Sequence, residues 1–407
     1  MGAFPDDDER FRSPPLDASA NAVGPDRRLG QFDRHSLVLW LNPLLSAALD
    51  SQGGALPSYS VEPPDSVPQR AFSAHLHETI HYWQTIGSTA GFLHTLGDAT
   101  SAFSVMDDLI ASKHHRKPVL HTVPDDADAA DPALLASVRW RHIEYGSALL
   151  DDPMRAVALL QRNPRYFVST GQTQLSLCAN TAASLADAFD RDFSGLINPE
   201  SWADAYERFV GDQHKGFETE GILRIPLGLR DIAEAQARIS EIQHRDLTQQ
   251  AVSWRDVRAN GWLGPVYARA FDRFLELAKL DEPETPREDS VNLFLLVCDV
   301  ALNPSTGYAD DLDQSRQFVL DFHPGARFER LCHVVARSPD LLKGHELPSR
   351  DGYEAVSRRL CGVLGGRPQR KWLSLFSNAG TRPPRETNLQ NSTPAEPMAP
   401  STFTGVF

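Results

Sequence analysis

The sequence predicts a mainly α-helical globule built from many packed helices, with a small β element and disordered ends. Three observations support this prediction. Apolar residues recur at steps of three and four along most of the chain, which is the period of one helix face. Hydrophobic residues make up 41% and charged residues 23% of the 407 residues, the composition of an ordinary globular protein. The two ends, residues 1–30 and 380–407, carry too few apolar side chains to offset the entropy of ordering.

Residues 31–379 are therefore expected to form the folded domain, which is long enough to divide into two lobes. Its first element is the apolar run at residues 36–41, Ser-Leu-Val-Leu-Trp-Leu, which ends at Asn42-Pro43. Periodicity does not decide whether this run is a strand or the opening of a helix. The sequence is compatible with a small sheet around residues 36–60 and 217–226.

The first long helix is predicted from residue 67 or 68 to residue 96, because apolar side chains recur there at helical spacing. A row of polar side chains follows one edge of its apolar stripe, which suggests that the helix lines a cleft: Ser73, His77, His81, Gln84 and Ser88. Residues 116–131 are rich in Pro, Asp and Ala and are predicted to form a loop. Asp131-Pro132 then has the residue types that cap and begin a helix, here over residues 133–150. Further helices are predicted over residues 173–190, 199–210, 229–246, 264–280, 287–302, 325–338 and 350–364.

Charge and apolar patterning exclude several classes of protein. The net charge of −14 argues against a protein that binds nucleic acid through its phosphate backbone, which requires clustered Lys and Arg. The longest apolar run, residues 291–302, is broken by Asn292 and Asp299, so we expect no membrane-spanning helix. The N-terminus lacks the basic start and apolar centre of a secretory signal, and the expected location is cytoplasmic. The four cysteines form no C-x-x-C pair and are predicted to be buried, reduced thiols.

The motif His77-Glu78-Thr79-Ile80-His81 lies within the first long helix. Residues four apart share one helix face, so the two imidazoles can bind one Zn²⁺ while Glu78 stands beside it. A chance match to H-E-x-x-H arises only about three times in a hundred chains of this composition. A catalytic zinc keeps three protein ligands and one water, and Glu78 has the position of the general base that takes a proton from this water.

The third ligand must come from elsewhere in the chain, and Glu234 is the strongest candidate. It lies in the predicted helix over residues 229–246, where small Ala residues on either side allow a close approach to the first helix. Glu234 is nearly opposite the apolar face of its own helix, so a surface ion pair with Arg230 or Arg238 is the alternative. Glu144, in the helix over residues 133–150, is the reserve candidate.

These residues resemble the gluzincin metallopeptidases, in which H-E-x-x-H on one helix is joined by a Glu ligand from a second helix. The second helix of that family often reads E-G-x-A, and this chain has Glu234-Ala235-Gln236-Ala237, with Ala where Gly is common. The gap of about 150 residues after His81 is longer than in the best-known members. Tyr82-Trp83-Gln84 is also similar to many bacterial proteins described only as metallopeptidases. The resemblance implies a zincin-like helical fold, one Zn²⁺ per chain, a cleft between the two helices, and a peptide or protein substrate.

Other parts of the chemistry stay open at the level of the sequence. The group that stabilises the oxyanion could be any of five side chains: His142, Tyr145, His244, Arg245 and Tyr308. Glu78-x-x-His81 and Glu241-x-x-His244 could also form half of a ferritin-like di-iron centre, with Glu144 and Glu220 as further ligands. A third possibility is a helical binding or scaffold protein in which the motif has no catalytic role. The sequence does not indicate a cleavage specificity or an oligomeric state.

Overall fold

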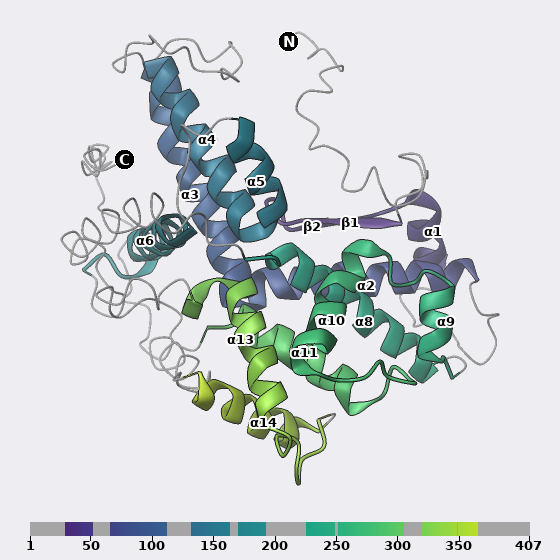
Figure 1. Ribbon diagram of the computed structural model, residues 1–407. Coiled ribbons are helices and arrows are strands. Elements are labelled where there is room, and N and C mark those ends of the chain that lie inside the picture. The colour runs from purple at the N-terminus through teal and green to yellow at the C-terminus, as the bar shows by residue number, and fades with distance from the viewer. Residues whose placement is uncertain are drawn as a thin grey trace, which may run out of the picture. The chain divides into compact units, whose positions relative to one another are not determined.

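In the computed structural model, most of the described residues lie in packed helices (Figure 1). The described residues are 29–51, 66–111, 132–162, 170–192, 225–248, 251–304, 320–347 and 349–364. Within them the mainly α prediction is confirmed, since the only strands are those of one two-stranded sheet. Several predicted segments lie outside the described residues: residues 1–28 and 380–407 of the disordered ends, the loop at residues 116–131, the helix at residues 199–210 and most of the strand at residues 217–226. Gly30, the last residue of the predicted disordered N-terminal segment, is ordered and begins a strand. No described helix is both long and apolar enough to cross a bilayer.

Most of the predicted helices are present, and their ends differ from the prediction by at most three residues. Their bounds are α4 Pro132–Asp151, α6 Thr170–Phe189, α8 Leu229–Thr248, α10 Pro265–Ala278, α11 Asp289–Leu302, α13 Pro324–Arg337 and α14 Arg350–Val363. Three shorter helices were not predicted: α1 Pro43–Ser51, α5 Pro153–Arg162 and α9 Trp254–Ala259. Their 9, 10 and 6 residues give too few turns for a clear period.

The prediction of one long helix to residue 96 is wrong, because the helix breaks at Ser88. Helix α2 spans Val67–Gly87 and α3 spans Thr89–Ala111. Ser88 has extended backbone angles, and its hydroxyl accepts a hydrogen bond from the Gly91 amide at 3.0 Å, which caps the start of α3. A Cβ at Gly91 would lie 2.2 Å from the Gln84 carbonyl oxygen, so only glycine permits this tight junction.

The β element is an antiparallel hairpin that lies against α2 (Figure 1). Strand β1 spans Gly30–Asp33 and β2 spans Val38–Leu41, with Gly30 opposite Leu41 and Phe32 opposite Leu39. Most of the run at residues 36–41 is therefore a strand, and its first two residues, Ser36 and Leu37, belong to the hairpin turn. The expectation of a sheet extending to residue 60 is wrong where it can be compared, because α1 occupies residues 43–51. The described part of the second predicted strand, residues 225–226, has no regular structure.

The main core lies among α8, α9, α10, α11, α13 and α14. Its centre is a cluster of fully buried aromatic rings in edge-on or tilted contact: Trp254, Phe271, Phe274, Phe294 and Phe328. Helix α8 packs on this core on one side and against α2 on the other, so both of its faces are covered (Figure 1). All four cysteines are buried and unpaired, as the sequence predicts. This arrangement holds α8 beside the helix that carries the H-E-x-x-H motif.

Candidate metal centre

Three side chains from α2 and α8 converge on one point. The Nε2 atoms of His77 and His81 are 3.1 Å apart, and each lies 3.5 Å from Oε2 of Glu234. A tetrahedral zinc with bonds of about 2.0–2.1 Å separates its ligand atoms by about 3.3 Å. The two nitrogens and one carboxylate oxygen thus have both the chemistry and the spacing of three zinc ligands. They form the one group of three or more potential metal ligands among the described residues.

The second ring nitrogen of His81 is held by Gln84. Nδ1 of His81 lies 2.7 Å from the Gln84 side-chain oxygen, while the Gln84 amide nitrogen donates to the Ala233 carbonyl and to Gln236, both at 2.9 Å. The Ala233 carbonyl can only accept, which fixes the orientation of the Gln84 amide. Nδ1 of His81 must therefore carry the hydrogen, which leaves the Nε2 lone pair directed at the common point.

The second ring nitrogen of His77 is held by Glu241. Nδ1 lies 3.4 Å from Glu241 Oε2, and this carboxylate also accepts hydrogen bonds from Arg238 at 2.6 Å and from Ser73. A carboxylate behind a metal-binding histidine fixes its tautomer and raises its basicity. Each histidine thus has one nitrogen for the common point and one nitrogen anchored to α8 or to its own helix.

Charges at the centre are strongly coupled. Burial alone would lower the pKa of His77, but hydrogen bonds to Glu234 and Glu241 outweigh it and raise the pKa to about 9. Burial would raise the pKa of Glu234, yet the two histidines hold it well below its usual range. Without an ion, a proton on the imidazole neutralises the buried carboxylates, and a divalent cation at the common point would replace that proton.

Glu78 lies directly beneath the hairpin. Its side chain is buried, and a Cβ added to Gly30 would meet Glu78 Cγ at 2.9 Å. Burial raises the pKa of the Glu78 carboxyl, while the positive charges of His81 and His77 and a hydrogen bond from the Phe32 backbone amide act in the opposite direction. A carboxylate whose pKa is raised is a better proton acceptor, which is the property that a general base requires.

Tyr267, near the start of α10, also lies at this centre, and the sequence did not indicate it. Its ring meets His77 edge-on, with the ring centroids 5.8 Å apart, and Arg238 lies 5.6 Å from the Tyr267 ring centroid. Burial and the charges of Glu234, Glu241 and Glu78 raise the pKa of the phenol to about 12, while Arg238 acts against them. The hydroxyl therefore stays protonated at neutral pH and remains a hydrogen-bond donor.

Of the five oxyanion candidates named from the sequence, the three whose side chains are described make their contacts elsewhere. Tyr145 is buried in a separate cluster with Ala148, Leu149 and Ala156, and Arg245 stacks on Trp262 at 3.9 Å. His244 contacts Phe72, with ring centroids 5.1 Å apart. The side chains of His142 and Tyr308 lie outside the described residues.

The alternatives considered for the ligands do not assemble. Glu144, the reserve candidate for the third ligand, lies 3.5 Å from Arg155 instead. The expected surface pairing of Glu234 with an arginine is also absent: Arg238 pairs with Glu241, and Arg230 lies 3.8 Å from Asp152. Glu241 supports His77 from its Nδ1 side, so the described residues do not form the di-iron centre, whose further candidate Glu220 lies outside them.

Comparisons with known proteins add no family assignment. No family model matches the chain, and no curated protein or solved structure was found to match it. The chemistry of the centre therefore has to be argued from its own geometry.

Proposed function

We propose that this protein is a zinc-dependent hydrolase, and specifically a metallopeptidase, in which His77, His81 and Glu234 bind one Zn²⁺ per chain. The observation that carries the proposal is the convergence of these three donors at zinc-ligand spacing with Glu78 beside them. The anchored second nitrogens of both histidines support it further, because a metal site requires fixed tautomers. A scaffold protein has no need for this arrangement.

When bound, zinc supplies a Lewis acid and lowers the pKa of a bound water to about 7. Glu78 accepts the proton of the attacking water on its carboxylate and then delivers it to the leaving amine. The Tyr267 hydroxyl, kept protonated by its surroundings, donates a hydrogen bond to the oxygen that gains negative charge during the attack. Gln84 and Glu241 hold the histidines in place throughout.

The hairpin supports a peptide as the substrate. The Phe32 amide hydrogen-bonds to Glu78, so it is directed away from β2 and toward the outer edge of β1. Among the described residues no other strand pairs with this edge. An extended peptide laid along β1 would gain backbone hydrogen bonds and bring an amide bond to Glu78. A small amide would also meet Glu78, but it would make none of these backbone hydrogen bonds with β1.

The test measures metal content and cleavage of a defined peptide library by mass spectrometry. Protein purified without added metal should contain close to one zinc per chain. Glu78→Gln should keep the zinc and lose cleavage, His81→Ala should lose both, and His75→Ala, on the same helix outside the ligand set, should lose neither. Cleavage that survives Glu78→Gln would show that the assignment of the general base is wrong. Absence of zinc from the unmodified protein would contradict the metal site.

A further inference from the structure

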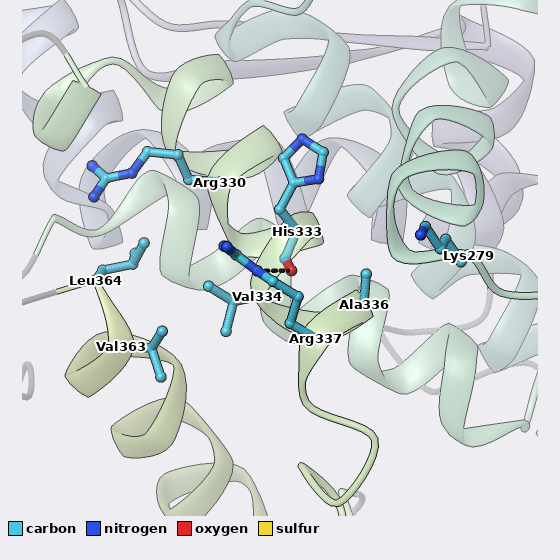
Figure 2. Close-up of a pocket in the computed structure, with 8 residues that line it drawn as sticks. All are labelled: Lys279, Arg330, His333, Val334, Ala336, Arg337, Val363 and Leu364. Carbon is cyan, nitrogen blue, oxygen red and sulfur yellow. Dashed lines mark hydrogen bonds between the residues drawn. The ribbon is translucent and has the colours of Figure 1, made fainter.

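A groove of about 400 Å³ lies between the C-terminal ends of α10, α13 and α14. Its lining residues are Lys279, Arg330, His333, Val334, Ala336, Arg337, Val363 and Leu364. Figure 2 shows Val363 and Leu364, at the end of α14, on the side of α13 toward which the Arg337 guanidinium is turned, and Lys279, at the end of α10, on the other side of α13. None of these residues belongs to the candidate metal centre.

The basic side chains are concentrated here by the spacing of α13. Arg330, His333 and Arg337 stand three and four residues apart and so share one helix face, and Lys279 adds a fourth basic group. No acidic side chain lines the groove, although the chain has 54 acidic against 40 basic residues. This local balance is opposite to that of the whole protein.

Two of these cations, Arg337 and Lys279, form no ion pair among the described residues. Arg330 is paired with Asp321 at 2.6 Å. Arg337 donates from Nε to the His333 carbonyl at 3.1 Å, and neither Arg337 nor Lys279 has an ion pair in the groove within the described part of the chain. Both residues end helices, where the helix dipole favours a cation. The helix dipole explains why a cation is found at each helix end, but it does not explain why apolar side chains lie beside these cations.

The apolar wall of the groove consists of Val363 and Leu364, with Val334 and Ala336 beside the cations. Val363 is 61% exposed, a large value for an apolar side chain at the end of a helix. A ligand that covered it would remove apolar surface from water. The concave shape suits a small molecule, since small ligands are bound in apolar hollows that contain a few oriented polar groups.

We infer that this groove binds a small organic anion, a carboxylate or phosphate that carries an apolar group. The guanidinium of Arg337 would hold the anionic head beside Val363 and Leu364, which would cover the apolar part, and the ammonium of Lys279 would attract the anion from the other side of α13. The site is separate from the metal centre: Tyr267 and Lys279 are twelve residues apart on or at the end of α10, or about 18 Å along its axis. Its ligand therefore does not touch the metal ligands, and the inference is independent of the proposed function.

The test is calorimetric titration of the full chain at about 50 mM salt, where screening is weak. Octyl phosphate and octanoate, kept below their micelle-forming concentrations, are compared with octanol and with inorganic phosphate. We expect the two amphiphilic anions to bind at least about tenfold more tightly than either control, because each control lacks one half of the recognised chemistry. The double variant Lys279→Gln/Arg337→Gln should weaken octyl phosphate binding at least about tenfold. Lys343→Gln, at a 79% exposed lysine outside the groove, should leave it unchanged.

Four results would overturn the inference. Octanol that binds as tightly as octanoate would show that the cations are not used, and inorganic phosphate that binds as tightly as octyl phosphate would show that the apolar wall is not used. Binding only to vesicles of anionic phospholipid would identify a membrane contact in place of a small-molecule site. A double variant with lower thermal stability and unchanged affinity would show that the cations serve only the helix ends.

Discussion

Replacement of Glu241 by Gln is predicted to weaken zinc binding, and to do so more strongly at high pH than near neutrality. Glu241 Oε2 lies 3.4 Å from His77 Nδ1, and this carboxylate makes the imidazole a stronger ligand. Loss of such a partner typically lowers metal affinity by about 10- to 100-fold, or about 1.4–2.7 kcal/mol. Gln keeps the shape of the side chain, and its carbonyl oxygen can still accept from His77 and Arg238. The variant removes the charge and replaces the oxygen that accepts from Ser73 by an amide group.

Protons oppose part of this loss near neutral pH. The pKa of His77 is about 9, because hydrogen bonds to Glu234 and Glu241 outweigh the effect of burial. At about pH 7.5 a proton must therefore leave His77 before zinc binds, which lowers the apparent affinity by about 30-fold. Gln at position 241 lowers the pKa of His77 and relieves some of this competition. We expect a loss of about tenfold or less at pH 7.5, rising toward 100-fold near pH 9.5, where His77 is mostly neutral in both proteins.

Competition with a chromophoric zinc chelator across pH 7.5–9.5 measures this difference. The matched control is Glu276→Gln, which removes the charge of a 67% exposed glutamate that pairs with Arg273 away from the centre. It should leave zinc affinity unchanged at every pH. An affinity of Glu241→Gln equal to that of the unmodified protein at pH 9.5, or a loss that is greatest at pH 7.5, would refute the reasoning.

Three further predictions follow from the same contacts. Zinc binding at pH 7.5 should release between about one and two protons, because His77 with its pKa of about 9 loses one and a bound water with a pKa of about 7 loses part of another; calorimetry in two buffers of different ionisation enthalpy measures the release, and a value near zero would be contradictory. Gly30→Ala should lower peptide cleavage by about 10- to 100-fold with zinc content unchanged, since its Cβ would displace Glu78; unchanged turnover would contradict the close approach. Burial lowers the pKa of His323 to about 4, so only the unfolded chain gains this proton as the pH falls from 6.5 to 4. The free energy of unfolding should therefore fall by up to about 3 kcal/mol between pH 6.5 and pH 4 because of His323. Denaturant titration of His323→Asn should show a smaller fall; a fall equal to that of the unmodified protein would be contradictory.

Local periodicity predicted the helices well because a helix face repeats along the chain itself. It did not predict the break at Ser88, since the apolar steps continue through Ile86, Ala90 and Leu93 across the junction. The break depends on the Ser88 cap and on the tight contact at Gly91, which do not alter the apolar pattern. A period reports which face of a segment is buried, and it does not report where the backbone turns.

The site was predictable in part for the same reason. His77, Glu78 and His81 are neighbours along one helix, and the polar row through Ser73 and Gln84 follows from their spacing. Ser73 indeed contacts Glu241, and Gln84 contacts His81. The spacing within α8 does not by itself predict a ligand at Glu234, because a position opposite the apolar face of a helix faces solvent unless both faces of the helix are covered.

The supporting residues could not be found from the sequence. Glu241 and Tyr267 contact His77 although they lie 164 and 190 residues after it in the sequence. No short-range sequence spacing predicts contacts over such distances. Glu241 was considered only as a di-iron ligand, where its E-x-x-H spacing was the visible signal. Its role depends on the packing of α8 against α2, which only the folded chain defines.

X-ray absorption spectroscopy at the zinc edge of the full-length protein tests the central claim most directly. Two imidazole nitrogens and one carboxylate oxygen from the protein, with a further light ligand, should lie at about 2.0–2.1 Å in a four-coordinate shell. His81→Ala should lose the bound zinc, and Glu234→Ala should bind zinc more weakly. A shell that contains sulfur, or six oxygens with no imidazole, would contradict zinc binding by His77, His81 and Glu234.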